Sequence, residues 1–195
     1  MIVEESAPKY YTLMTPAEYL SWERKETTKH EYVSGTIVSM AGASPKHNLI
    51  LSHIISATDS FLKGKPCNIY PSDLRSYVKS KESYFYPDAS IVCGELELSD
   101  DIKDTVKNPA VIFEILSPST EDYDFGKKFF YYNMQIESLR QYITIDSTKM
   151  FIRISRKQPN DARKFEEYTQ NSESLWINTI EFSIPLHDIY EGIFM

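Results

Sequence analysis

The chain reads YFYPDASIVC over residues 84–93 and AVIFEILSP over residues 110–118, and DFGKK follows at residues 124–128. The first two stretches are rich in β-branched and aromatic residues, which is typical of strands. One acid interrupts each of them, Asp88 in the first and Glu114 in the second. An unpaired buried carboxylate is costly or becomes neutral, so something has to compensate these two groups. A divalent cation is one such compensator.

The two acids differ in how strongly their surroundings favour a functional role. Asp88 follows Pro87, and an edge position where Asp88 faces water or caps a turn explains it equally well. Glu114 lies inside a near-continuous apolar run of the kind that is buried on both faces of a sheet. Function is the favoured explanation for Glu114, and a buried salt bridge is the alternative.

Lys128 and Glu31 complete the set of candidate site residues. Lys128 lies beside the apolar stripe of a predicted helix, from which its ammonium can reach the strand end where Glu114 is expected. The alternative to a functional role for Lys128 is an ion pair with Asp124 on the helix surface. Lys127 is expected to face solvent. Glu31 enters a predicted hairpin, where an ordinary surface acid is the alternative.

Taken together, these four side chains have the chemistry of a phosphodiesterase site. Mg²⁺ prefers carboxylate oxygens and keeps several waters, so Asp88, Glu114 and Glu31 could hold it, and Mn²⁺ could replace it. A bound metal ion polarises a phosphoryl oxygen and lowers the pKa of an attacking water. Lys128 could orient that water or stabilise the developing charge.

Helices and strands alternate around these segments. Thr15 to Glu18 form a capping box, and Ser34-Gly35 predicts a tight hairpin turn. The expected helices are 16–25, 45–63, 122–136 and 185–190, and the expected strands are 31–33, 36–38, 67–70, 74–78, 84–93, 110–116, 141–145, 151–154 and 164–168, with a further edge strand or hairpin near Trp176. The strand-helix-strand order over residues 110–145 predicts a parallel pair. We expect an α/β chain with a central mixed sheet, flanked by helices and extended by C-terminal strands.

Length and composition set limits on the class of protein. The 195 residues fit a single domain, 1–195, and the net charge of −7 disfavours a surface that grips nucleic acid indiscriminately. Cys67 and Cys93 do not form a close pair or a zinc motif, so both are expected to be reduced thiols. The sequence shows no signal peptide and no apolar run long enough to span a membrane, which predicts a cytoplasmic protein without a membrane partner.

Other polar residues are weaker candidates. His47 and His53 are six positions apart, which does not bring them to one helix face, so surface or core roles are favoured. Arg75 could lie near a phosphate group, but a salt bridge at the strand end explains it equally well. The chain has no nucleophile-elbow motif for a serine hydrolase and no glycine-rich phosphate loop.

The ordered series of motifs resembles the Uma-type restriction endonuclease family, a branch of the PD-(D/E)XK nuclease superfamily. The resemblance covers Thr15 through Tyr190. Its marks are Glu31 before the Ser34-Gly35 hairpin, His47, Tyr70 to Arg75, Tyr86-Pro87-Asp88, Glu114 to Thr120, Asp124 to Lys128 with Tyr132, and Leu139 to Tyr142.

The resemblance implies a restriction-endonuclease-like core with a Mg²⁺-type site. Asp88 matches the acid of the PD motif, Glu114 matches the acid of the (D/E)XK motif, and Glu31 matches the helix-side acid that often completes the site. The superfamily lysine should lie two residues after Glu114, but that position is Leu116. Lys128 on the following helix is the implied replacement.

Two hypotheses follow. The first is a metal-dependent endonuclease that hydrolyses phosphodiester bonds of DNA, with Asp88, Glu114 and Glu31 as metal ligands and Lys128 as water orienter. The second is a catalytically inactive nuclease-fold protein that serves as an interaction or nucleic-acid-binding module. A homodimer is expected for the first, because cutting both strands of a duplex needs two sites.

Overall fold

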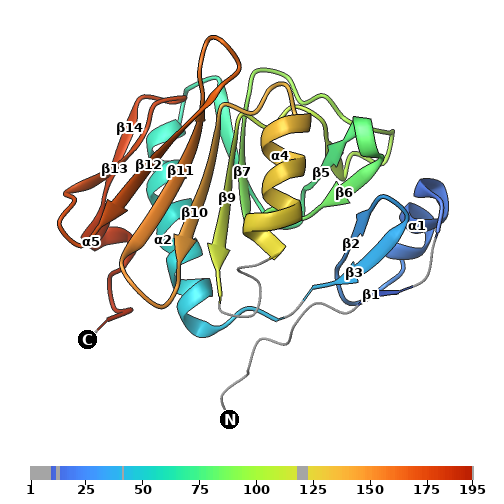
Figure 1. Ribbon diagram of the computed structural model, residues 1–195, viewed down its shortest axis with the longest axis horizontal. Coiled ribbons are helices and arrows are strands. Elements are labelled where there is room, and N and C mark those ends of the chain that lie inside the picture. The colour runs from blue at the N-terminus through green and yellow to red at the C-terminus, as the bar shows by residue number, and fades with distance from the viewer. Residues whose placement is uncertain (1–9, 12–13, 41, 118–122, 195) are drawn as a thin grey trace.

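The computed structural model describes residues 10–11, 14–40, 42–117 and 123–194 (Figure 1). The helices are α1 (Pro16–Glu23), α2 (Pro45–Leu62), α4 (Phe129–Gln135) and α5 (Leu186–Ile189), with a 3₁₀ turn at Lys79–Lys81 and a π-helical turn at Asp124–Lys128. The strands are β1 (Tyr10–Tyr11), β2 (His30–Val33), β3 (Thr36–Ser39), β4 (Cys67–Pro71), β5 (Arg75–Val78), β6 (Ser83–Phe85), β7 (Ala89–Cys93), β8 (Thr105–Val106), β9 (Val111–Leu116), β10 (Gln141–Asp146), β11 (Phe151–Lys157), β12 (Arg163–Thr169), β13 (Ser174–Ile177) and β14 (Phe182–Pro185).

The central sheet has the strand order β12-β11-β10-β9-β7-β4. Strands β9 and β10 are parallel, and their neighbours in this sheet are antiparallel, so the predicted parallel pair and the predicted mixed sheet are confirmed. Helix α4 lies in the crossover between β9 and β10, in front of the sheet in Figure 1, while α2 lies behind it. The sheet is therefore covered by a helix on each face.

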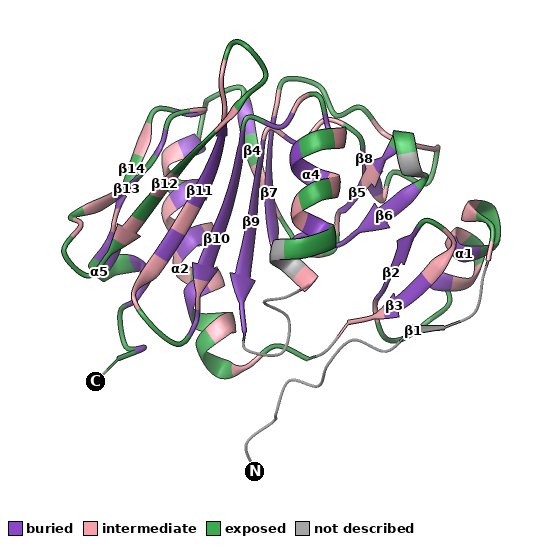
Figure 2. Cartoon of the chain, in the orientation of Figure 1, coloured by how far each residue is buried: buried purple, intermediate pink, exposed green. Residues whose placement is uncertain are grey.

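The alternation of side chains along β9 assigns its residues to these two faces. Val111, Phe113 and Ile115 pack in the core cluster of α2, and Ile112 packs with Tyr132 of α4. All six residues of β9 are buried, which Figure 2 shows as an unbroken buried strand in the middle of the sheet. Glu114 therefore faces the α4 side.

A second sheet, in the order β1-β3-β2-β6-β5-β8, lies beside α4 (Figure 1). The single strand predicted over residues 84–93 is wrong: β6 belongs to this second sheet and β7 to the central sheet. Pro87 has no backbone N–H to donate to a ladder, which explains why the chain leaves one sheet there. Asp88 consequently lies at the junction of the two sheets.

The N-terminal elements form as their sequences predict. Thr15 caps α1, and its side chain and that of Glu18 each accept a hydrogen bond from the other residue's backbone N–H. Ser34 and Gly35 both have positive φ, 49° and 96°, as the tight turn between β2 and β3 requires. The turn sets the register in which Glu31 is opposite Val38.

The acidic connection over residues 95–107 is less solvated than its charge run suggests. Asp104 is hydrogen-bonded by Arg24 Nε at 2.8 Å and forms a closer ion pair with Arg75. Arg75, which is 2% exposed, also donates to the Thr105 hydroxyl at 3.1 Å and the Tyr86 hydroxyl at 3.2 Å. Of the two explanations for Arg75, the structure shows the salt bridge.

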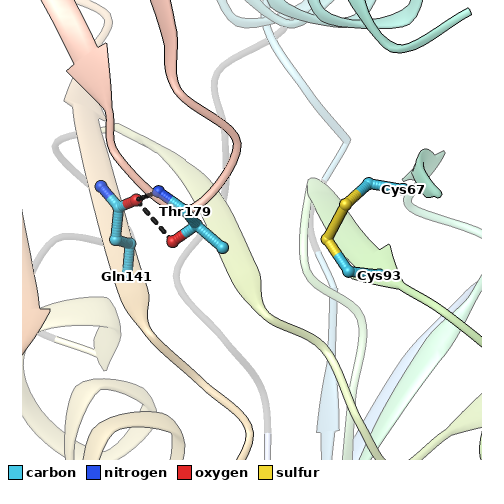
Figure 3. Close-up of a disulfide and its surroundings, with 4 residues drawn as sticks. All are labelled: Cys67, Cys93, Gln141 and Thr179. Carbon is cyan, nitrogen blue, oxygen red and sulfur yellow. Dashed lines mark hydrogen bonds between the residues drawn. A yellow bond between two sulfur atoms is a disulfide. The ribbon is translucent and has the colours of Figure 1, made fainter. Parts of the chain in front are cut away.

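The expectation of two reduced cysteines is wrong, because a disulfide joins Cys67 on β4 to Cys93 on β7 (Figure 3). The two residues are directly opposite in the antiparallel ladder, a register that the 26-residue sequence separation does not reveal. Asp88 precedes the first residue of β7 and Cys93 ends it, so the disulfide is at the far end of that strand.

Figure 3 also shows a contact between β10 and the loop after β13, in which Gln141 Oε1 accepts hydrogen bonds from the N–H and hydroxyl of Thr179, at 2.9 and 2.7 Å.

None of the helices in the described part of the chain is long and apolar enough to cross a membrane.

Candidate functional site

Lys128 connects two elements that are far apart in the sequence. Its Nζ lies 2.9 Å from Glu31 Oε1 on β2 and 3.0 Å from Glu114 Oε1 on β9. Lys128 is 4% exposed, Glu31 is 2% exposed and Glu114 is 3% exposed. Lys128 is therefore buried and not on a helix surface, and Glu31 is not a surface acid. The expected ion-pair partner of Lys128, Asp124, has a side chain outside the part that the structure describes. Lys127, one residue earlier, is exposed as expected.

Glu31 is held by a backbone group and a hydroxyl as well as by the lysine. Its Oε1 accepts the Tyr86 N–H at 3.0 Å, and its Oε2 accepts the Tyr123 hydroxyl at 2.8 Å. Tyr86 comes two residues before Asp88, so the segment that leaves β6 fixes both acids at once. A buried carboxylate needs such a set of donors to remain ionised.

Asp88 is oriented from two sides. Its Oδ2 accepts the backbone N–H of Ile115 on β9 at 2.7 Å, and its Oδ1 lies 3.1 Å from His47 Nε2. His47 is in the first turn of α2, where its own N–H bonds to the Ser44 hydroxyl. The bond to Ile115 holds Asp88 beside the residue that follows Glu114.

A cavity of about 340 Å³ brings the four candidate residues together. Its lining includes Glu31, Asp88, Glu114 and Lys128, and also Lys29, His47, Ser72 and Tyr123. The carboxylates come from three elements: β2, the turn before β7, and β9. Three acids and two lysines therefore face one space, although they are spread over 100 positions from Lys29 to Lys128 when counted along the printed sequence.

Tyr132 of α4 lies near the charged cluster of Lys128, Glu114 and Glu31. Burial raises the pKa of the Tyr132 hydroxyl well above its ordinary value; the positive charge of Lys128 opposes this, while the carboxylates of Glu114 and Glu31 add to it. Tyr132 therefore stays protonated and neutral, and adds no charge to the cluster.

The donor set fits a hard divalent cation. Within residues 10–11, 14–40, 42–117 and 123–194, no group of three or more His, Cys, Asp or Glu side chains is arranged to hold one metal ion. Mg²⁺ does not need such a group, because one or two carboxylates with waters and substrate phosphates suffice. Asp88, just before β7, and Glu114, on the adjoining strand β9, supply two carboxylates at the wall of an open cavity.

Two site residues have a role that the sequence reasoning missed. His47 contacts Asp88, and the signal was its position in the first helical turn, which points it at the neighbouring sheet end. Tyr123 donates to Glu31, and it lies just before Asp124 in the stretch that carries Lys128. Neither contact can be read from spacing, because both join segments that are separated by tens of residues.

Comparison with known proteins identifies a family and relatives for this chain. The family model Uma2, described as "Putative restriction endonuclease", matches residues 16–187. Two uncharacterised proteins of Synechocystis sp. are similar: slr1290 is 34% identical over 96% of both chains, and sll1609 is 35% identical over 69% of this chain and 75% of its own.

A solved structure shows the same fold. The crystal structure of a "putative nuclease belonging to DUF820" from Anabaena variabilis has a TM-score of 0.75 and 16% identity, covering 92% of this chain and 99% of that one. The expected restriction-endonuclease-like α/β fold, a mixed sheet flanked by helices, is therefore confirmed. With the match over residues 16–187, the chain belongs to the Uma2 family, whose description is "Putative restriction endonuclease".

Proposed function

We propose that this protein is a metal-dependent endonuclease that hydrolyses phosphodiester bonds of DNA. One observation carries the proposal: Lys128 meets Glu114 and Glu31 at the wall of a cavity that Asp88 also lines. Membership of a family described as restriction endonucleases supports a nuclease, and a nuclease implies a nucleic-acid substrate. The domain acts as one unit, 1–195, in this proposal.

Asp88 and Glu114 would hold Mg²⁺ or Mn²⁺. Glu31 would join them as an auxiliary ligand by turning away from Lys128, with which it is now paired. When bound, such an ion polarises a phosphoryl oxygen and lowers the pKa of an attacking water. The net charge of −7 makes this ion important for another reason, since it offsets the carboxylates that would repel a phosphate.

The chain's own residues would orient the reactants. Lys128 is buried between two glutamates, so its ammonium is fixed in position and needs no reorganisation to stabilise charge on a phosphate. Tyr123 fixes Glu31, and His47 fixes Asp88. Lys29, at the cavity wall, donates to the Ser72 carbonyl at 3.0 Å and is paired with Asp73 at 2.6 Å. A phosphate that enters the cavity would compete with Asp73 for its positive charge.

The alternative is an inactive nuclease-fold protein that serves as an interaction or nucleic-acid-binding module. One observation favours it: Lys128 already compensates both buried glutamates, so the fold does not need a metal ion to keep them charged. Metal binding separates the two functions, because only the endonuclease requires it.

Cleavage tests the proposal. Double-stranded DNA, single-stranded DNA and RNA are incubated with the protein and Mg²⁺ or Mn²⁺, and the products are compared with those of Glu114→Ala and Lys127→Ala. We expect the wild type and Lys127→Ala to cut DNA only when metal is present, and Glu114→Ala to lose activity. Cleavage that survives in Glu114→Ala, or that needs no metal, would overturn the site assignment.

We infer a cytoplasmic location and a homodimeric state for this enzyme. The Cys67–Cys93 disulfide opposes the first inference, since disulfides are rare in a reducing cytosol. Cell fractionation decides it: protein in the cytosolic fraction supports the inference, and protein in an exported fraction contradicts it.

A further inference from the structure

Strand β12 is at the edge of the central sheet, with β11 as its partner on one side. Its seven residues are antiparallel to β11, and the register pairs Arg163 with Lys157 and Thr169 with Phe151. Among the strands of the described residues, none pairs with its outer side. An edge of this length is a template for a further strand unless its side chains prevent pairing.

Two hydrogen bonds show which residues of β12 direct their backbone groups away from β11. One is made by Lys157, the β11 residue opposite Arg163, and the other by Thr169 of β12. The Lys157 N–H donates to the Arg140 carbonyl, and the Thr169 N–H donates to the Ser172 hydroxyl, so neither is used between β11 and β12. Backbone groups of an antiparallel strand alternate in direction. The N–H and C=O groups of Arg163, Phe165 and Glu167 therefore also point away from β11.

The side chains along this edge have a symmetric order of charge. Two cations, Arg163 and Lys164, precede Phe165, and two anions, Glu166 and Glu167, follow it. If a second copy of β12 paired antiparallel with Phe165 opposite Phe165, Lys164 would be opposite Glu166 and Arg163 opposite Glu167. Opposite charges directly across a ladder are favourable, and this register places them there on both faces of the sheet.

Other registers lose this match. Moving the centre to Glu166 puts that residue opposite itself, and moving it to Lys164 does the same for a lysine. Like charges directly opposite are destabilising. The sequence therefore selects one pairing, the one in which the outward-pointing backbone of Phe165 meets its own copy.

The centre of this edge is apolar and exposed. Phe165 is 53% exposed, and its ring stacks on Phe129 of α4 with centroids 5.8 Å apart. Next to Phe129 along α4, Phe130 is 49% and Met134 61% exposed. Aromatic side chains and methionine are enriched in protein interfaces, and an aromatic pair across the axis would add to the ladder.

We propose that β12 is the homodimer interface, in which two copies pair antiparallel about Phe165 and join their central sheets. This deepens the homodimeric part of the proposed function, but it does not depend on nuclease activity. The same charges could instead protect the edge from pairing, as charged edge residues often do. A protective pattern has no need of self-complementary order, and a monomeric protein is the outcome that would show it.

The test uses two charge-reversal variants. In a homodimer of either variant, like charges would face each other, whereas in a mixed dimer of the two variants, opposite charges would face each other. In a homodimer of the Lys164→Glu variant, the acids at positions 164 and 166 of one chain would be opposite the acids at 166 and 164 of the other. In a homodimer of the Glu166→Lys variant, lysines would be opposite lysines at the same positions. A mixture of the two variants restores both opposite-charge pairs. Lys25→Glu is the matched control, because it makes the same charge change on an exposed residue near α1, away from β12.

The oligomeric mass is measured by analytical ultracentrifugation over a wide range of protein concentration. We expect the wild type and Lys25→Glu to have twice the mass of the 195-residue chain. Each reversal alone should raise the dimer dissociation constant at least about tenfold, and their mixture should recover the dimer. A monomeric wild type, an unaffected Lys164→Glu variant, or a mixture that stays monomeric would overturn the interface.

A second variant keeps the proposal testable if Glu166→Lys fails to fold, since Glu166 is bonded by Arg156 at 2.8 Å. Phe165→Pro removes the outward N–H at the centre of the proposed ladder and leaves the bonds to β11 intact. We expect the circular dichroism spectrum of a folded protein and the mass of a monomer by analytical ultracentrifugation, and a folded dimer would contradict the interface. A dimeric wild type that does not cut DNA would contradict the proposed function alone, and a monomeric one that cuts DNA would contradict the interface alone.

Discussion

Lys128 Nζ lies 3.0 Å from Glu114 Oε1, so a lysine 14 positions later in the printed sequence reaches the acid on β9. The position two residues after Glu114, where a (D/E)XK motif has its lysine, is the buried Leu116. The π-helical turn Asp124–Lys128 ends at this lysine, and π-turns recur at functional sites because they re-aim side chains. The positive charge beside Glu114 thus comes from a neighbouring element.

Removing the positive charge of Lys128 should destabilise the fold. Lys128→Met leaves Glu31 and Glu114, whose side chains are 2% and 4% exposed, without their cation. Breaking a buried ion pair by removing one partner costs about 3–5 kcal/mol, so we expect a loss of that size in the free energy of unfolding in urea. Lys127→Met, at the exposed neighbour, should change it by less than about 0.5 kcal/mol. Equal effects of the two variants would contradict the buried network.

The Asp104 cluster should make stability depend on pH. Burial alone would raise the pKa of the Asp104 carboxyl, but hydrogen bonds from Arg24 and Arg75 outweigh it and hold the pKa well below its usual value. A depressed folded-state pKa stabilises the protein above the unfolded pKa of about 4, and this contribution is lost as the pH falls below that value. We therefore expect Asp104→Asn to cost about 2 kcal/mol at pH 7 and less at pH 3.

The measurement for Asp104→Asn is the free energy of unfolding of wild type and variant at a series of pH values. The two curves should converge as the pH is lowered. A difference that stays constant from pH 7 to pH 3 would show that the carboxylate charge is not what stabilises this cluster.

The disulfide should stabilise the protein without affecting the site. Cys67→Ala, or reduction with dithiothreitol, opens a loop of 26 residues, for which the chain-entropy model gives about 3.5 kcal/mol. Denaturant unfolding with and without reductant measures this loss. Because Cys93 ends β7 while Asp88 precedes it, we expect any stabilisation by Mn²⁺ to be the same in the oxidised and reduced protein. A change in that stabilisation would show that the bond acts on the site.

Local patterns predicted most of the elements, because their causes are local. The capping box at Thr15 and the Ser34-Gly35 turn depend on residues within a few positions of each other, and both formed as expected. The run through Asp88 was misread as one strand, since periodicity does not report which sheet a strand joins. Pro87 was the local signal that the run breaks there.

Contacts between distant segments were only partly predictable. The approach of Lys128 to Glu114 could be anticipated, because a strand and the next helix are neighbours in a crossover. The contacts of His47 with Asp88 and of Cys67 with Cys93 depend on strand order and register in the folded sheet. Those are set by packing over the whole chain, so the sequence alone did not reveal them.

The most direct test of the account is Mn²⁺ binding measured by isothermal titration calorimetry, with the melting temperature followed in parallel. The account predicts that the wild type binds Mn²⁺ and melts at a higher temperature when the ion is present. At a free Mn²⁺ concentration of 100 times the dissociation constant, binding adds about 2.7 kcal/mol to the free energy of unfolding. Asp88→Asn and Glu114→Gln should lose this binding, while Lys127→Ala keeps it. If the wild type binds no Mn²⁺ or Mg²⁺, or if Asp88→Asn binds them equally well, the metal site is contradicted and the inactive nuclease-fold protein is the better account.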